Sequence, residues 1–130
     1  MQLQDYLNRF WASKIDNHII DLFNHYILFE VVALNHGTSS SHYLKFHQVK
    51  SFYYTNDQLP IMPEEDDYLE LSSVVFEQEK SNKIELRFNG GENYRSSSMN
   101  FILEIWGREM LVESSSIEVD GMLFDIGDFE

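Results

Sequence analysis

The amino-acid sequence predicts a mainly β (α+β) protein with one antiparallel sheet system and a short N-terminal helix. Apolar residues recur with a period of two in short stretches, and turn residues separate these stretches at a spacing of roughly 8–12 residues. The connections are of hairpin length, which argues against a parallel βαβ arrangement. We therefore expect about seven or eight strands in a sandwich or a curled, barrel-like sheet.

The clearest strand signal lies in residues 98–126. Asp120-Gly121 interrupts alternating apolar residues there, and such a pair favours a two-residue type I′ hairpin because both turn residues need φ > 0. The register is well specified, since a slip of one residue would move the apolar set into solvent. The expected pairs are Val119–Met122, Ile117–Phe124, Glu118–Leu123 and Ser116–Asp125.

Residues 2–12 predict a short amphipathic helix. Leu3, Leu7, Phe10 and Trp11 recur at helical spacing, with polar residues mostly on the opposite face. About eleven residues are marginal as an isolated helix in water, so this helix must dock on the rest of the protein. Phe10 and Trp11 are the expected docking residues.

The first half of the chain contains three expected strands, in residues 16–23, 26–34 and 42–54. Residues 26–34 are apolar on both faces apart from Glu30, which predicts a central strand covered on both faces, although a short buried helix has a similar pattern. Residues 36–41 form a polar loop. The alternation of the third strand breaks at Val49, which indicates a bulge near residues 47–48.

The second half begins with a polar loop in residues 55–67, which holds both prolines. A second polar loop is expected at residues 89–98, and a reversal at residues 107–108. Strands are expected in residues 68–77, 83–88, 99–106 and 110–112. The apolar residues expected to share inward faces are Ile84, Leu86, Phe88, Met99, Phe101, Leu103 and Ile105.

Length and composition indicate a single domain, residues 1–130, with a substantial core. The absence of cysteine excludes disulfides, thiolate zinc sites and cysteine nucleophiles. No apolar run approaches the roughly 20 residues of a membrane helix. The first residues also lack the basic and apolar regions of a signal peptide, so we expect a cytoplasmic protein.

The net charge is −13, from 22 acidic and nine basic residues, and residues 96–130 contribute eight acids against Arg108 alone. A field of this sign repels nucleic acid and anionic membranes, and it steers a basic protein partner toward the surface. The same charge also serves solubility, which is its ordinary role in many proteins.

The candidate partner-binding site is an acidic run with tyrosines on both sides. Aromatic side chains beside a charged rim are typical of an interface hot spot, and equally of a sheet edge that packs on its own loop. A run of acids is a docking strip for lysine and arginine, or an ordinary solvated loop. The residues are Tyr53, Tyr54, Glu64, Glu65, Asp66, Asp67 and Tyr68.

No constellation of catalytic or metal-binding residues stands out. On a regular strand His42 and His47 face opposite ways, so they share a metal ion only if a bulge intervenes. Glu30 and Glu104 lie among apolar residues and are the best carboxylates for glycosidase chemistry, but the alternation directs them to solvent. A GxSxG nucleophile motif is absent. We expect no enzyme, no catalytic residues, no metal and no cofactor.

Two segments carry a resemblance to a known family: residues 46–54, FHQVKSFYY, and residues 115–126, SSIEVDGMLFDI. In these segments the chain resembles the YxiG-like family of small, acidic bacterial proteins. It is also similar in general organisation to the immunity proteins of polymorphic toxin systems. The resemblance implies a small β-rich protein, not an enzyme, that neutralises a toxin domain encoded nearby.

These observations favour a non-enzymatic, acidic protein-binding module with a basic partner, which the resemblance makes a toxin domain. The alternative is a small-ligand or carbohydrate-binding β-domain in which Trp106, Trp11 or the tyrosines form a stacking platform. An exposed Trp106 beside a concave sheet face would favour the alternative.

Overall fold

The computed structural model describes residues 2–35, 37–57, 60, 64, 67–79, 82–88 and 93–127, with the backbone alone for residues 35, 88, 93 and 94. The helical elements are α1 (Leu3–Leu7) and the short 3-10 helix η1 (Asn8–Phe10). The strands are β1 (Ser13–Asp21), β2 (Tyr26–Asn35), β3 (Thr38–Thr55), β4 (Glu70–Phe76), β5 (Asn82–Phe88), β6 (Asn93–Met99), β7 (Phe101–Ile105), β8 (Arg108–Val119) and β9 (Met122–Asp125). Their pairing is antiparallel throughout, so the predicted fold class is confirmed.

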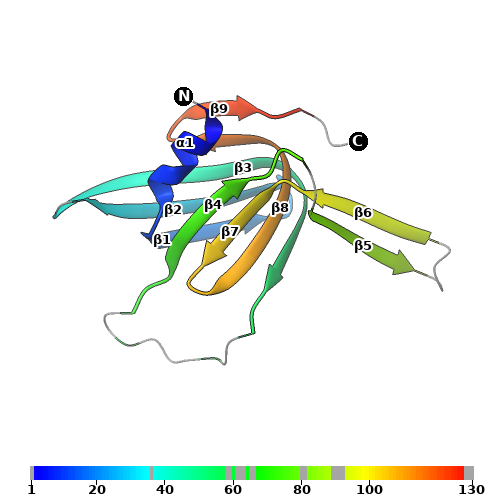
Figure 1. Cartoon of the computed structure of the whole chain (residues 1–130), viewed down its shortest axis with the longest axis horizontal. Helices are drawn as coiled ribbons and strands as arrows, with labels where there is room; N and C mark the ends of the chain where they lie inside the picture. The colour runs from blue at the N-terminus through cyan, green and yellow to red at the C-terminus, as the bar shows by residue number, and fades with distance from the viewer. Residues whose placement is uncertain are drawn as a thin grey trace.

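Seven of these strands form one sheet in the order β3-β2-β1-β4-β7-β8-β9. The sheet curls because β8 pairs with β7 and then β9 along one edge, and with β3 along the other. β1 and β4 share the two residue pairs Ser13–Leu71 and Lys14–Glu70 and then separate. The result is a curled sheet that does not close as a barrel (Figure 1).

β5 and β6 form a two-stranded ribbon that projects from the curled sheet (Figure 1). Because residues 93–99 are strand, the prediction of a loop through residues 89–98 was wrong for its second part. Leu86 is exposed, so its predicted inward position was also wrong. A two-stranded ribbon has no second layer of its own to cover that side chain.

Two buried polar side chains join the base of the ribbon to the curled sheet. Glu113 accepts hydrogen bonds from the Ser98 backbone N–H at 2.9 Å and from the Ser51 hydroxyl at 3.1 Å. The Asn100 amide donates to the Ser114 carbonyl at 2.9 Å and accepts the Ser114 N–H at 3.1 Å. The strand expected over residues 99–106 is therefore interrupted at Asn100.

The C-terminal hairpin has the register that the sequence predicts, with all four expected residue pairs. Asp120 and Gly121 have φ values of 50° and 88°, as a type I′ turn requires. The preceding reversal, between β7 and β8, is a turn of the same kind. Its two residues are Trp106 (φ 44°) and Gly107 (φ 80°), one position earlier than expected.

β3 begins earlier than the sequence indicates. Thr38 pairs with Asn35, so the prediction of a loop over residues 36–41 was wrong for residues 38–41. A tight turn containing Gly37 (φ 80°) joins β2 to β3, and residue 36 lies outside the described residues. The expected bulge is confirmed. Gln48 has φ 50°, and the register between β3 and β8 shifts just after it.

α1 and η1 pack against β4 (Figure 1) and contribute the buried side chains of Leu7 and Phe10 to the core. The Gln4 amide also donates to and accepts from the β4 backbone, at 2.9 and 2.8 Å. Trp11 is 74% exposed, so the prediction that it docks was wrong. The α-helix ends at Leu7, and the chain turns at Ala12 (φ 55°). Trp11 therefore does not continue the apolar face of α1.

The concave face of the sheet and the helical segment enclose the core. The Phe101 ring lies 5.0 Å from that of Phe46 and 5.2 Å from that of Phe76, between centroids. β2 is central, as expected, but Leu34 on its other face is 75% exposed, because one face of a curled sheet faces solvent. The buried apolar cluster comprises Leu7, Phe10, Ile15, Ile27, Phe29, Val31, Leu44, Phe46, Leu71, Val74, Phe101, Leu103, Ile105, Met110, Val112, Ile117 and Val119.

Candidate functional site

The turn between β1 and β2 displays two apolar side chains to solvent. Leu22 is 73% exposed and Phe23 is 95% exposed. Asp21 fixes the turn, because its Oδ1 accepts the backbone N–H groups of Phe23 and Asn24, each at 2.9 Å, and its Oδ2 accepts the Asn24 amide at 3.0 Å. The hydrogen bonds from Asn24, and then that from Phe23, lower the pKa of Asp21 below its ordinary value, so the fixing carboxylate is ionised at neutral pH.

The bulge in β3 lies beside this turn and is followed by a run of aromatic residues. The Val49 N–H donates to the His25 carbonyl at 2.8 Å and so joins the bulge to the turn. Tyr54 lines an apolar cavity, Tyr53 lines a cleft beside the ribbon, and Phe52 contributes to both. The turn and the aromatic run therefore form one connected surface.

An apolar cavity of about 370 Å³ opens where β1 and β4 separate. Its size falls within the range of pockets that hold small molecules. Water in such a cavity finds few hydrogen-bond partners, so an apolar group that displaces it gains free energy. The lining residues are Ile15, His18, Ile20, Phe29, Phe52, Tyr54, Leu69, Ile105 and Met110.

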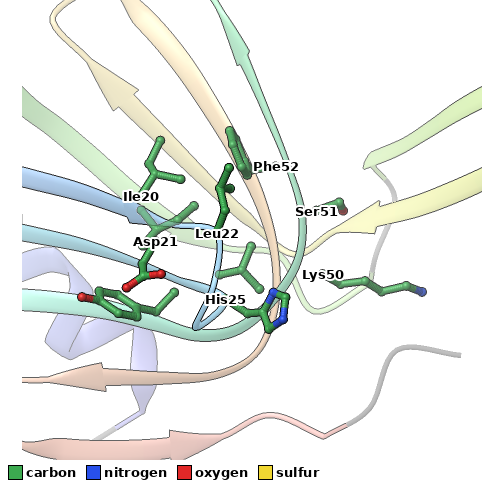
Figure 2. Close-up of a pocket in the computed structure, with 10 residues that line it drawn as sticks. Ile20, Asp21, Leu22, His25, Lys50, Ser51 and Phe52 are labelled. Atoms are coloured by element: carbon green, nitrogen blue, oxygen red, sulfur yellow. The ribbon is translucent and has the colours of Figure 1, made fainter.

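A smaller depression of about 240 Å³ lies on the side of the β1–β2 turn (Figure 2). It shares Ile20 and Phe52 with the apolar cavity. Figure 2 shows these two side chains and Leu22 gathered on one side, with His25 and Lys50 on the other. We use "the mouth" for the surface formed by the apolar cavity, this depression and the β1–β2 turn.

Beside the mouth, two exposed glutamates face each other on the convex side of the sheet. Glu104 of β7 is directly opposite Glu109 of β8, while the next residues, Ile105 and Met110, line the cavity. Like charges directly opposite destabilise an antiparallel pair. Neither glutamate forms an ion pair with a residue that the structure describes. The two carboxylates therefore place two like charges close together on the strands that also carry Ile105 and Met110.

The structure distributes the tyrosines of the predicted partner site over different surfaces. Tyr54 belongs to the mouth, Tyr53 to the cleft beside the ribbon, and Tyr68 is exposed just before β4. The sequence analysis did not single out Leu22 and Phe23, which are the most exposed large apolar residues of the mouth.

The acids of the predicted partner site are described in part. The Glu64 N–H donates to an Asp67 carboxylate oxygen at 2.8 Å, and the Asp67 N–H donates to the Glu64 carbonyl at 3.0 Å. These two bonds join Glu64 to Asp67, and both of these side chains are exposed. Glu65 and Asp66, the other two acids of the run, lie outside the described residues.

A polar network joins β3 to the C-terminal hairpin. His47 Nε2 lies 2.9 Å from Glu118 Oε1, and the Tyr43 hydroxyl donates to the other Glu118 oxygen. The hydrogen bond from Tyr43, and then that from His47, lowers the pKa of Glu118, while the same bond to Glu118 raises the pKa of Tyr43. His42 Nδ1 lies 2.7 Å from Asp120 Oδ2, so the two histidines contact different acids, as their opposite faces require.

The carboxylates considered for glycosidase chemistry lie on the surface. Glu30 is exposed and accepts a hydrogen bond from the Asn17 amide at 3.2 Å, and Glu104 is exposed beside the mouth. In the part of the chain that the structure describes, no group of three or more histidine, aspartate or glutamate side chains is placed to hold a metal ion. His36, one of the five histidines, lies outside that part.

The fold and the mouth define a small antiparallel β protein with an exposed apolar surface at the open side of a curled sheet. The chain belongs to the YxiG-like protein family, whose sequence model matches residues 3–124. Searches of curated proteins and of solved structures gave no match. Over the described ranges, no helix is long and apolar enough to cross a membrane.

Proposed function

We propose that the protein is a non-enzymatic binding module that docks a basic protein partner at the mouth. The observation that carries the proposal is the pair Leu22 and Phe23, which Asp21 holds in an exposed position beside an apolar cavity. Binding energy at interfaces concentrates in aromatic and apolar anchors, and a fixed anchor loses little conformational entropy on binding.

Charge complementarity favours a basic partner. The chain has a net charge of −13, and Glu104 and Glu109 face each other on β7 and β8, each next to a residue that lines the apolar cavity. A lysine or arginine that the partner places between them would relieve their repulsion. The long-range attraction would mainly raise the association rate, and salt would reduce that effect.

We further propose that the partner is a basic toxin domain and that docking neutralises it, as immunity-type proteins do. A strongly acidic surface with a fixed apolar anchor suits rapid and tight capture of one cationic protein. The negative surface disfavours nucleic acid and anionic membranes as partners. The proposed location is the cytoplasm, where a neutralising protein would meet the toxin of its own cell.

The test compares wild type with Phe23→Ser and with the control Leu123→Ser, which changes an exposed apolar residue of β9. Each immobilised protein captures partners from lysate of the native host at low and high salt, and the captured protein is then purified for kinetic measurements. We expect a basic protein whose affinity falls about 30-fold for Phe23→Ser and is unchanged for Leu123→Ser. Capture of no protein, or equal affinity of the two variants, would contradict the proposal.

A second candidate function, binding of a small apolar ligand, is favoured by the volume and the apolar lining of the cavity. Neither expected tryptophan lines that cavity: Trp11 is exposed beyond η1, and Trp106 lies in the β7–β8 turn, 5.4 Å from the Arg108 guanidinium. The cavity therefore suits an apolar ligand better than a carbohydrate.

Fluorescence titration with N-phenyl-1-naphthylamine, an uncharged apolar probe, tests this second function. Ile20→Trp should fill part of the cavity and abolish saturable binding, since Ile20 is half-exposed and the larger ring can turn into the opening. A wild-type protein that does not bind the probe would exclude this function and leave the proposed partner docking unaffected.

A further inference from the structure

A second cleft, of about 570 Å³, lies between β3 and the β5–β6 ribbon, and we name it the ribbon cleft. Figure 1 shows the ribbon projecting away from the curled sheet. The ribbon cleft shares Phe52 with the apolar cavity, and Lys50, Ser51 and Phe52 with the depression of the mouth, but the ribbon residues line the cleft alone. The lining of the ribbon cleft includes Lys50, Tyr53, Leu86, Arg95, Ser96 and Ser97.

The ribbon cleft is lined by two cations and, among the residues that the structure describes, by no acidic side chain. This composition is unexpected in a chain with 22 acidic and nine basic residues. Lys50 belongs to β3 and Arg95 to β6, so two different strands each contribute one cation to the lining of the cleft. Figure 2 shows the Lys50 side chain extending away from Ile20 and Leu22.

Both cations are available to a ligand. Neither Lys50 nor Arg95 forms an ion pair or a side-chain hydrogen bond with a residue in the described ranges. The hydroxyls of Ser96 and Ser97 likewise donate to none of those residues. Arg95 and Ser97 lie on the same face of β6, because side chains alternate along a strand. Charged and hydroxyl donors that line one cleft, with no acceptor among the described residues, are the groups that hold a carboxylate or sulfonate.

The remaining walls suit an apolar body. Tyr53 presents a half-exposed ring, and Leu86 of the ribbon is 57% exposed. An aromatic or aliphatic group placed between them would bury apolar surface on both sides. The cleft thus combines a cationic part with an apolar part, which is the complement of an amphiphilic anion.

Glu113 limits the charge of the ligand. Its buried carboxylate lies next to Ser51, a lining residue of the cleft, and both of its oxygens accept hydrogen bonds from groups inside the protein, Ser51 and Ser98. The negative charge of Glu113 offsets part of the attraction from Lys50 and Arg95. We propose that the ribbon cleft binds a small organic anion with a single charge, a carboxylate or sulfonate carried on an aromatic or aliphatic body.

Lys50 also lines the depression of the mouth, whereas Arg95 lines the ribbon cleft and no part of the mouth, so Arg95 distinguishes the two surfaces. A fluorescent probe tests the site directly. The probe is 8-anilinonaphthalene-1-sulfonate, which carries one sulfonate on an aromatic body. Arg95→Gln and Lys50→Gln should each weaken its binding about tenfold, since each removes one charge-assisted hydrogen bond. The control Lys14→Gln removes a cation that already contacts Asp16, at 3.9 Å, and should leave binding unchanged.

Backbone amide chemical shifts locate the bound probe. We expect saturable binding of one probe per chain, with the largest shift changes at Ser96 and Ser97. Binding that is absent, that does not saturate, or that is equal in wild type and Arg95→Gln overturns the proposal. If Ile20→Trp loses binding of the sulfonate probe while Arg95→Gln keeps it, the proposal is also overturned, because the probe would then lie in the mouth.

Discussion

At Asp120 and Gly121 the backbone adopts left-handed dihedral angles that few residues tolerate without strain, with φ of 50° and 88°. Aspartate is one of the few residues other than glycine that adopt this region routinely. Here Asp120 is also held by β3, because its Oδ1 accepts the Tyr43 N–H at 2.9 Å. Glycine tolerates it because it has no Cβ. These two residues fix the register of the C-terminal hairpin, and the register decides which side chains of β8 and β9 face the core.

Gly121→Val should destabilise the protein by about 1–3 kcal/mol through backbone strain. A steric clash is not the cause, since the nearest atom that a Cβ would meet is the Tyr43 hydroxyl, at 3.8 Å. The control is Gly127→Val, at φ 88° but beyond the last strand, where the chain can relax. Gly37 is unsuitable as a control because it also has positive φ in a tight turn. Urea unfolding measures the difference, and equal midpoints for the two variants would contradict the strain argument.

Glu118→Gln should destabilise the protein by about 1 kcal/mol at pH 7, because the carboxylate accepts hydrogen bonds from Tyr43 and His47. These bonds lower the pKa of Glu118 in the folded state. The stabilisation is therefore present above the pKa of an unfolded glutamate, about 4.3, and is lost as pH falls through the lower folded value. Urea unfolding at pH 7 and near pH 3 should show the difference between variant and wild type shrinking, and a constant difference would refute the assignment.

Tyr43, which donates this hydrogen bond to Glu118, contributes to stability with the opposite pH dependence. The pKa of Tyr43 is raised, first by its hydrogen bond to Glu118. Its contribution is present below the pKa of an unfolded tyrosine, about 10, and is lost as pH rises through the higher folded value. Tyr43→Phe therefore serves as the companion variant, destabilised at pH 7 and approaching wild-type stability only in strongly alkaline solution.

The sequence predicts that the N-terminal helical segment exists, but it predicts the docking face of that segment only in part. A continued α-helix would place Phe10 and Trp11 side by side on the apolar face. The α-helix instead ends at Leu7, and η1 winds more tightly, so the faces after that point no longer follow the 3.6-residue period. Phe10 stays in the core and Trp11 points to solvent.

Phe10→Ala should therefore destabilise the protein by about 3–5 kcal/mol, the usual result of removing a buried ring from a packed core. Trp11→Ala removes a larger ring but should change stability by no more than about 0.5 kcal/mol, because that ring is exposed. Thermal unfolding of both variants measures the difference. A larger loss for Trp11→Ala would mean that the helical segment docks through the face that the sequence first suggested.

The β1–β2 turn shows why the most exposed part of the mouth was missed. Leu22 and Phe23 were assigned to a strand because they are apolar, although Asp21 stands three residues before Asn24. Aspartate in that position commonly caps a turn through its side chain, and here Asp21 does so. That local signal could have moved both apolar residues out of the strand and into an exposed turn.

At the scale of the whole molecule, the sequence predicts the strands better than their arrangement. Alternation and turn chemistry are local, so the C-terminal register and the β3 bulge could be predicted from a few residues. The curl of the sheet depends on β3 pairing with β8, which lies far away in the sequence. The mouth forms only because β1 and β4 separate, and no local pattern encodes that gap. Tyr53 and Tyr54, adjacent in sequence, line different hollows because successive side chains of a strand point to opposite faces, but the hollows themselves depend on the arrangement of the sheet.

Charge removal at two groups of acids should affect partner association differently. The groups are Glu104 with Glu109, and the four acids of residues 64–67. Glu104→Gln together with Glu109→Gln removes a like-charge pair and should stabilise the free protein by about 0.2–1 kcal/mol. The same double variant should slow association with a basic partner and reduce its salt dependence, because the pair lies on the strands whose next residues, Ile105 and Met110, line the apolar cavity. Replacing all four acids of residues 64–67 with amides removes twice as much charge and should also leave the fold intact.

The comparison of these two variants decides where the partner docks. If the partner docks at the mouth, the double variant slows association more than the fourfold variant, although it removes less charge, since the effect of a charge falls steeply beyond about 8–10 Å in physiological salt. Association rates measured by surface plasmon resonance over a salt series give the result. A slower rate in the fourfold variant alone would place the partner on the acidic run beside Tyr68 and away from Leu22 and Phe23.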